Sequence, residues 1–289
     1  MRLAQYVWAG KTCVGIVEGD VVHDLGEPSL DGALAKGLLD SFTRKEEELV
    51  HSTAGTPLSS VRLLSPVLSP EKIFCVAENY RSHVKESDGK VAKKPYLFTK
   101  FRNAIVAHGD PIVIPRISKD VDWEAELAVV IGKEGKHILR EDAISHVAGY
   151  CVANDVSFRD LQFPEGHPKV LSRLGQNWVL GKALDSAFPL GPWLVTADEV
   201  PNPHDLDISL TVNGVTKQKS NTGEMVFSVA TLIEYISAGI TLRPGDIIST
   251  GTPQGVAAFT DQRYLREGDV VEASIEGIGT LRNPVQAER

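Results

Sequence analysis

Residues 122–132 read DWEAELAVVIG and join three carboxylates to an unbroken apolar run. Read as a strand, the stretch alternates its side chains between two faces and places Asp122, Glu124 and Glu126 together on one of them. The run 127–131 is typical of a strand that is buried on both faces. The stretch therefore predicts a buried sheet whose central strand starts at an acidic margin.

Three carboxylates on one face are electrostatically unfavourable. Two unit charges about 4 Å apart repel each other by roughly 4 kcal/mol at an effective dielectric near 20. Water at an exposed sheet edge would offset this repulsion, and acidic residues on edge strands discourage aggregation. A divalent cation in a cleft at the sheet margin would offset it as well. The pattern alone leaves both interpretations open.

The remaining pattern predicts a β-rich α+β chain. Residues 1–25 alternate around two turns as in an antiparallel meander, and 29–42 and 45–53 have helical patterns. Prolines 57, 66 and 70 then mark a connection, so we expect a small N-terminal α/β unit, 1–65, and a larger domain, 66–289. Strand signals dominate the larger domain, whose clearest helical patterns are 140–147 and 225–237.

Composition excludes several classes of protein. The 289 residues carry a formal charge of −8 without a basic cluster, which argues against a nucleic-acid partner. No apolar run approaches the roughly 20 residues of a membrane helix, and the first residues lack a signal-peptide pattern. We therefore expect a cytoplasmic protein with no membrane partner. The three cysteines are far apart and lie in apolar contexts, as reduced core thiols do.

Three further polar segments flank apolar ones. His83 and Glu86 are three residues apart, which suits a general base with an orienting carboxylate or a simple surface pair. Asp155 follows the apolar YCVA and is either a helix N-cap or a further cation ligand beside Glu124 and Glu126. GTPQG, 251–255, permits close approach of a ligand to the backbone, although such a sequence is usually only a turn.

Several motifs in order resemble the fumarylacetoacetate hydrolase family. They span about 70–285 and include KIFCVAENYRSHVKE, DWEAELAVVIG, GYCVANDVSFRDLQ, WVLGK and LRPGDIISTGTPQGV. The resemblance implies that Glu124, Glu126 and Asp155 hold one Mg²⁺ or Mn²⁺ per subunit. Asp122 is then an outer neighbour of the metal or a solvent-facing residue.

The resemblance also implies roles for other residues. His83 and Glu86 correspond to the family's catalytic pair in a lid, and Lys182 to a lysine that polarises or positions an oxygen near the metal. Further contacts with the substrate are then expected from four positions, which are Arg159, Gln162, Lys100 and Thr252. The implied fold is a β-roll, a mixed sheet wrapped on itself, and the implied assembly is a homodimer.

The chain departs from the family pattern around the expected pocket. CVAENYR places Ala77 and Glu78 where the commoner phrase is C-V-G-L-N-Y-R, GVAAF replaces the usual G-V-G, and the insert FPEGHPKVLSRLGQN is long and basic. These changes affect the expected substrate and leave the metal ligands intact.

The resemblance predicts a metal-dependent hydrolase that cleaves a carbon–carbon bond in a 1,3-diketo acid such as an acylpyruvate or fumarylpyruvate. Two alternatives use the same metal site: decarboxylation of oxaloacetate or another 2-oxo acid, and isomerisation of a 2-hydroxymuconate-type substrate. An alternative of another class is a non-catalytic, metal-binding accessory protein.

Overall fold

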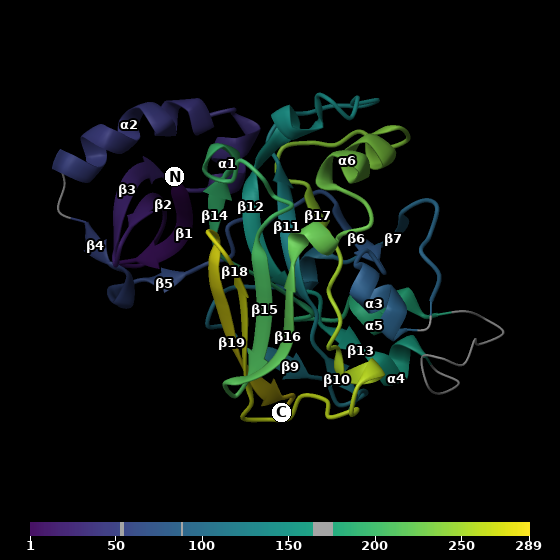
Figure 1. The fold of residues 1–289 in the computed structure, drawn as a ribbon. Coiled ribbons are helices and arrows are strands. Elements are labelled where there is room, and N and C mark those ends of the chain that lie inside the picture. Colours follow the sequence, from purple (N-terminus) through teal and green to yellow (C-terminus); the bar gives the residue numbers. More distant parts are fainter. Residues whose placement is uncertain (53–54, 88, 164–175) are drawn as a thin grey trace.

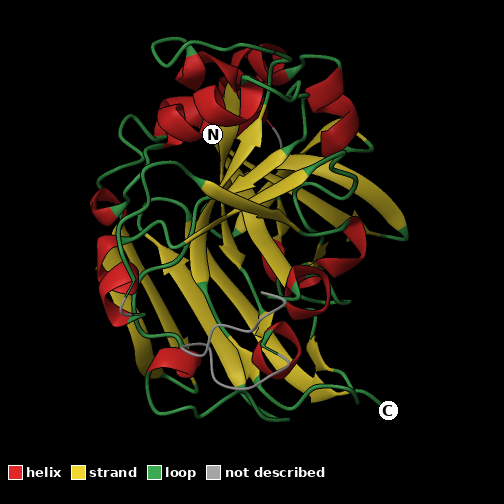
Figure 2. Ribbon diagram, turned by 90° about the vertical axis from the view of Figure 1, so that its right-hand side faces the viewer, coloured by secondary structure: helices red, strands yellow, loops and turns green. Residues whose placement is uncertain are grey.

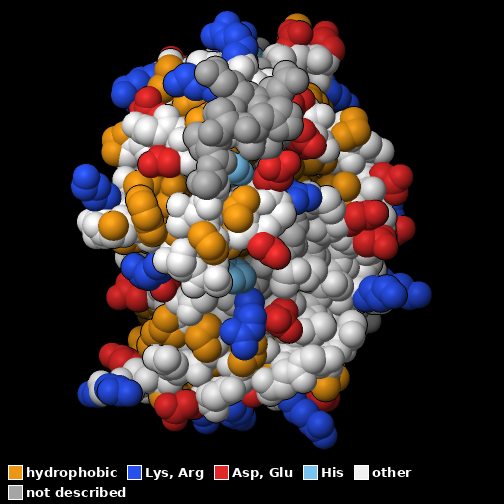
Figure 3. Space-filling model, turned by 90° about the vertical axis from the view of Figure 1, so that its left-hand side faces the viewer, with side chains coloured by type: hydrophobic (Ala, Val, Ile, Leu, Met, Phe, Trp, Pro, Cys, Tyr) orange, Lys and Arg blue, Asp and Glu red, His pale blue; other side chains and the backbone are white. Residues whose placement is uncertain are grey.

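The computed structural model describes residues 1–52, 55–87, 89–163 and 176–289. The chain begins with the expected meander: β1 (Arg2–Trp8), β2 (Lys11–Glu18) and β3 (Val21–Glu27) pair antiparallel. Short strands β4 (Thr56–Pro57) and β5 (Arg62–Leu63) pair with β3 and β1. Figure 3 shows this side of the molecule, where lysines and arginines are scattered singly among acidic and apolar side chains.

Two helices cover the meander, α1 (Leu30–Ala35) and α2 (Leu39–Ser52). Ser29 caps α1 by accepting a hydrogen bond from the Gly32 N–H. The sequence patterns placed the boundary between the two helices between residues 42 and 45. This is wrong, because Gly37 ends α1 in the left-handed conformation (φ +66°). The Leu38 N–H then donates to the Ala33 carbonyl, and α2 starts at the next residue.

The meander continues directly into the main sheet (Figure 1). Strand β1 pairs with β14 (Phe188–Thr196), which is followed across the sheet by β12 (Val147–Asn154) and β11 (Ala125–Ile131). Beyond β11 lie β17 (Ile247–Ser249), β6 (Ile73–Ala77) and β7 (Tyr96–Thr99). The β17–β6 pair is parallel whereas the pairs on either side are antiparallel, so the sheet is mixed.

A second sheet packs on the first (Figures 1 and 2). Its order is β16 (Val215–Asn221), β15 (Asp207–Val212), β18 (Val270–Ile275), β19 (Gly279–Ala287) and β9 (Ile112–Ile114). Strands β15 and β18 alternate buried with less buried residues, whereas every residue of β11 is buried. The expected β-rich α+β fold with mixed sheets is therefore confirmed, as is the strand that is buried on both faces.

Short elements surround one end of the main sheet. Strand β10 (Val121–Asp122) pairs with β13 (Ser157–Phe158), and α3 (Arg81–Glu86), α4 (Arg159–Gln162) and α5 (Trp178–Lys182) lie beside them. Strand β8 (Ile105–Val106) runs parallel to β14. The 3₁₀ turns are η1 (Leu58–Ser60), η2 (Arg102–Ala104), η3 (Ala143–His146), η4 (Ala197–Glu199), η5 (Thr222–Glu224) and η6 (Ala257–Phe259).

Two expected helices are shorter than their patterns. Residues 140–147 form only the single turn η3, and 225–237 form α6 (Val229–Ser237), which Ser228 caps. Val226 and Phe227 precede this cap, whose backbone is extended, and their N–H groups donate to the backbone carbonyl and side-chain oxygen of Asn79. No helix in the described part of the chain is long and apolar enough to cross a membrane.

Candidate metal and active site

The three predicted metal ligands lie close together near a break between two strands. Strand β10 ends at Asp122 and β11 starts at Ala125, so Glu124 lies in the bend between them. The Asn154 side chain accepts a hydrogen bond from the Glu124 N–H, and the Asp155 N–H donates to the Glu124 carbonyl. The result is that one carboxylate oxygen from each of Glu124, Glu126 and Asp155 lies within 4.8 Å of the others.

Asp155 is part of this cluster and does not cap a helix. Helix α4 starts four residues later and has no side-chain cap. The two carboxylate oxygens of Asp155 instead face ammonium groups, Lys100 Nζ at 2.8 Å and Lys182 Nζ at 3.0 Å. The side chain is completely buried, so these lysines compensate for the water it has lost.

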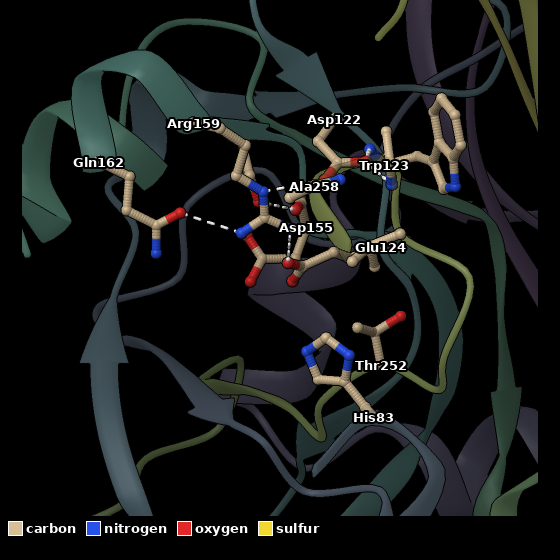
Figure 4. Close-up of polar contacts among 12 residues, drawn as sticks. His83, Asp122, Trp123, Glu124, Asp155, Arg159, Gln162, Thr252 and Ala258 are labelled. Carbon is tan, nitrogen blue, oxygen red and sulfur yellow. Dashed lines mark hydrogen bonds and ion pairs between the residues drawn. The ribbon is translucent and has the colours of Figure 1, made fainter. Parts of the chain in front are cut away.

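Arg159 links the metal ligands to Asp122 (Figure 4). Its guanidinium donates to Asp122 Oδ2 at 2.9 Å, Glu124 Oε1 at 2.5 Å and Gln162 Oε1 at 2.9 Å. Burial alone would raise the pKa of Glu124, but the charges of Lys182 and Arg159 outweigh it and lower that pKa to about 2. Glu124 is therefore ionised.

Glu126 has the opposite environment. One of its oxygens accepts hydrogen bonds from the Ser249 hydroxyl at 2.5 Å and the Gly251 N–H at 2.9 Å. Burial, together with the negative charges of Asp155 and Glu124, raises the pKa of Glu126 well above its usual value. The two glutamates of one short strand segment thus have widely separated pKa values, which is typical of a functional site.

The His83–Glu86 pair is not a surface ion pair, because His83 is buried and the Glu86 side chain is only 13% exposed. His83 Nδ1 lies 3.1 Å from Glu86 Oε2 on α3, and the other Glu86 oxygen accepts the Gly255 N–H at 2.9 Å. The imidazole packs edge-on against Phe259. In Figure 4 His83 faces the carboxylates across a gap, with Thr252 beside it. Gly255 has φ +103°, and a Cβ there would lie 2.1 Å from the Lys217 carbonyl oxygen.

Lys182 ends α5 and points at the ligands. Its ammonium donates to Glu124 Oε2 at 2.8 Å and to Asp155 Oδ2 at 3.0 Å, and it lies 5.1 Å from the centre of the Phe98 ring. Burial would lower its pKa, but the charges of Asp155 and Glu124 prevail and raise it. The ammonium is therefore a fixed positive charge at the edge of the carboxylate cluster.

A cavity of about 240 Å³ lies over these groups. Five polar side chains line its inner end, which are Glu124, Glu126, Arg159, Lys182 and Thr252. His83 and Gln162 also line it. Of the ten sequence-predicted site residues, seven therefore line the cavity. Glu86 and Asp155 are direct partners of residues that line it, and Lys100 pairs with Asp155.

The structure places Lys100 beside Asp155, whereas the resemblance implies that it contacts the substrate. It does not line the cavity, and its buried ammonium donates to the carbonyls of Val156, Lys182 and Ala187 besides pairing with Asp155. These interactions indicate that Lys100 holds Asp155 in position. Asp122 is likewise not solvent-facing: it is fully buried and accepts hydrogen bonds from the N–H groups of three residues as well as from Arg159.

Sequence reasoning missed Gln218, which helps to hold the turn 251–255 through Thr252. Thr252 donates its hydroxyl to the Ala125 carbonyl and accepts the Gln218 side-chain N–H, both at 2.9 Å. Gln218 is buried, and its oxygen accepts the Ala125 N–H at 2.9 Å. Gln218 lies among other polar residues of β16, so the local sequence gives no signal for its burial. Of the basic insert, 163–177, residues 164–175 lie outside the described part of the chain.

The residues of the cluster fit a hard divalent cation. Three buried carboxylates converge, and carboxylate oxygens are the ligands that Mg²⁺ and Mn²⁺ prefer. Glu126, which is unfavourable as a buried anion beside two other carboxylates, gains the counter-charge it lacks if a cation is bound. The donor set therefore agrees with a metal site without choosing between the two ions.

Comparison with known proteins defines the class. The family model described as "Fumarylacetoacetate (FAA) hydrolase C-terminal" matches residues 72–286. The chain belongs to this family.

Its relatives have several activities. Over 230 residues the chain is 49% identical to the oxaloacetate tautomerase FAHD2A, mitochondrial, of Bos taurus, covering 79% of this chain and 71% of that protein. A related tautomerase of Rattus norvegicus is 47% identical over 275 residues, with 92% and 84% covered. Maleylpyruvate hydrolase from Sphingobium sp. SYK-6, solved with manganese(II) and pyruvate, is 31% identical with a TM-score of 0.81 over all of both chains.

The name of a further solved structure gives another reaction. It is 2-hydroxyhepta-2,4-diene-1,7-dioate isomerase from Mycobacterium marinum, which is 33% identical, with a TM-score of 0.77 over 100% of this chain and 99% of that one. Hydrolase, tautomerase and isomerase names thus accompany one fold. The family is established by these likenesses, and the reaction has to be argued from the site.

Proposed function

We propose that the chain is a metal-dependent enzyme that interconverts the keto and enol forms of oxaloacetate or of a closely related small 2-oxo diacid. The observation that carries the proposal is a buried histidine, His83, which faces a carboxylate cluster across a small cavity. Relatives that are nearly half identical are named oxaloacetate tautomerases, which supports the same choice.

Tautomerisation requires one group to move a proton between carbon and oxygen. Glu86 Oε2 is placed to accept a hydrogen bond from His83 Nδ1, so the Nδ1 proton lies toward Glu86 and Nε2 is the ring nitrogen free to take or return a proton. The Gly255 N–H fixes Glu86 from behind. His83 is thereby oriented as a general base and acid for C3 of the substrate.

The other polar groups hold the substrate and its charge. A divalent cation bound by Glu124, Glu126 and Asp155 would supply Lewis-acid polarisation of the 2-oxo group. Lys182 places positive charge where the enol oxygen develops negative charge, and Gln162 offers an amide at the same wall. The small volume of the cavity limits the water that can compete for the proton.

Hydrolysis of a 1,3-diketo acid is the second candidate. It needs the same base, with His83 deprotonating a water instead of a carbon acid, and the similarity to maleylpyruvate hydrolase favours it. Decarboxylation of oxaloacetate would need no base. The products therefore distinguish the three reactions.

The test uses chelator-treated protein that is reloaded with Mg²⁺ or Mn²⁺. Enol oxaloacetate is added, and loss of enol absorbance, formation of pyruvate and cleavage of acylpyruvates are followed separately. We expect metal-dependent loss of the enol without pyruvate, and His83→Asn should slow it by about 10²–10⁴-fold. His137→Asn is the matched control, because His137 is exposed and its positive φ suits asparagine.

Acylpyruvate cleavage without accelerated enol loss would reject the tautomerase in favour of the hydrolase. Metal binding without turnover on any of these acids would favour the non-catalytic accessory protein. We also propose a homodimer, as the family resemblance implies, and the absence of nucleic-acid and membrane partners stays a prediction. Cytoplasmic location also stays a prediction, since the vertebrate relatives are named mitochondrial.

A further inference from the structure

Glu78 stands at the end of the cavity opposite the carboxylate cluster. The register of three strands gives the direction: Ser249, which contacts Glu126, pairs with Cys75 on β6, and β6 continues through Ala77 to Glu78. Glu78 is exposed, whereas Glu124 and Glu126 are buried, and all three residues line the cavity. The cavity therefore has an inner end at Glu126 and an outer end at Glu78.

Between the two ends the wall is aromatic. Phe98 pairs with Cys75 and stacks on Trp178 with ring centroids 4.6 Å apart. Tyr96 pairs with Ala77 farther out, and its ring lies 5.8 Å from that of Trp178. A substrate that leaves the inner end thus meets apolar rings before it reaches Glu78.

Glu78 has a fixed backbone and an unneutralised charge. It has a left-handed φ of +53°, between the end of β6 and Asn79, whose side chain is buried and hydrogen-bonded to the Phe227 N–H. Its Oε1 accepts the Ser87 hydroxyl at 3.1 Å, and among described residues it makes no ion pair. The nearby lysines 90, 93 and 94 are exposed, and none of them lines the cavity.

We propose that Glu78 determines substrate length by repelling a carboxylate at the outer end of the cavity. In oxaloacetate the second carboxylate is separated from the 2-oxo group by one methylene, so it stays at the inner end beside Arg159 and Lys182. In a longer diacid the second carboxylate reaches Glu78. Two like charges about 5 Å apart in a water-like dielectric weaken binding about fourfold, and apolar tails are unaffected.

This inference rests on the proposed function, since it assumes that the 2-oxo acid group binds at the inner end. It is tested by binding rather than turnover. Calorimetry on Mn²⁺-loaded protein measures Kd for 2-oxo diacids of five, six and seven carbons and for the methyl-ended 2-oxo acid of each length. The readout is the ratio of the two Kd values at each length.

Glu78→Gln keeps the size and the Ser87 contact but removes the charge. We expect the seven-carbon diacid to bind the variant about fourfold more tightly while the monoacid is unchanged, and Glu78→Lys to increase the preference further. Glu267→Gln, which removes an exposed charge remote from the cavity, should change neither ligand.

The possible failures are distinguishable. If 2-oxo acids bind and the ratio is the same in wild type, Glu78→Gln and Glu78→Lys, the role of Glu78 is wrong and the proposed function stands. If no 2-oxo acid binds the Mn²⁺-loaded protein at all, the proposed function and this inference both fail.

Discussion

Asp122 provides the sharpest test of how the site is held together. It is fully buried, and its two oxygens accept hydrogen bonds from the N–H groups of Trp123, Ala257 and Ala258 and from Arg159 Nε at 2.9 Å. The substitution Asp122→Asn keeps the shape but removes the charge and replaces one acceptor oxygen with a donor. An N–H donor then faces another donor, and Arg159 loses one of its two carboxylates.

The magnitude follows from the burial of this pair. Removing one partner from a buried ion pair costs about 3–5 kcal/mol, because the remaining charge stays desolvated. Arg159 is only 5% exposed, although Glu124 still compensates part of its charge, which favours the lower half of that range. We therefore expect the free energy of unfolding to fall by about 3–4 kcal/mol.

The chain contains a matched control. Arg62 and Asp110 form the same kind of ion pair at 2.9 Å, but their side chains are 63% and 27% exposed. Asp110→Asn should cost about 0–1 kcal/mol, since exposed ion pairs are weak. Both variants are unfolded with urea in the presence of a chelator. Losses that agree within about 0.5 kcal/mol would refute the argument that the buried charge of Asp122 anchors Arg159.

Two further outcomes are expected from the active site. Gly255→Ala places a methyl group against the Lys217 carbonyl, which displaces the N–H that holds Glu86. We expect kcat to fall at least tenfold with little change in metal affinity. An unchanged kcat would contradict this coupling between Gly255 and Glu86. Because the pKa of Glu126 is raised, its bound proton competes with the metal, so the apparent Mn²⁺ affinity should increase with pH until Glu126 is ionised. Calorimetry in buffers of different ionisation enthalpy should detect the release of this proton when Mn²⁺ binds. The absence of proton release would contradict the raised pKa.

Much of the fold could be predicted because local patterns and tertiary environment agree. The strand β11 has a continuous apolar run and is buried throughout. Strand β14 was not predicted, since Pro189, Gly191 and Pro192 interrupt a segment that nevertheless pairs on both sides. Here the pairing partners override the local signal, and they come from distant parts of the chain.

For the site, residue type and spacing identified the carboxylates but not their environments. The alternation along 122–126 placed Asp122 with Glu124 and Glu126, because a sequence does not reveal the break between β10 and β11. Partners such as Gln218 approach from the second sheet and leave no local trace. The family resemblance identified Lys100 and Thr252 as candidate site residues, whereas only the structure shows what their polar atoms contact.

The acidic stretch is stable because its charges are balanced in three dimensions. The buried cluster contains four carboxylates and three cationic side chains: Asp122, Glu124, Glu126, Asp155, Lys100, Arg159 and Lys182. With a proton on Glu126, three negative and three positive charges cancel, so the fold can form before a metal binds. A divalent cation that displaces this proton adds two positive charges and exposes one negative charge, which leaves the cluster with one net positive charge. The same exchange that completes the metal site thus makes the inner end of the cavity attractive to an anionic 2-oxo acid.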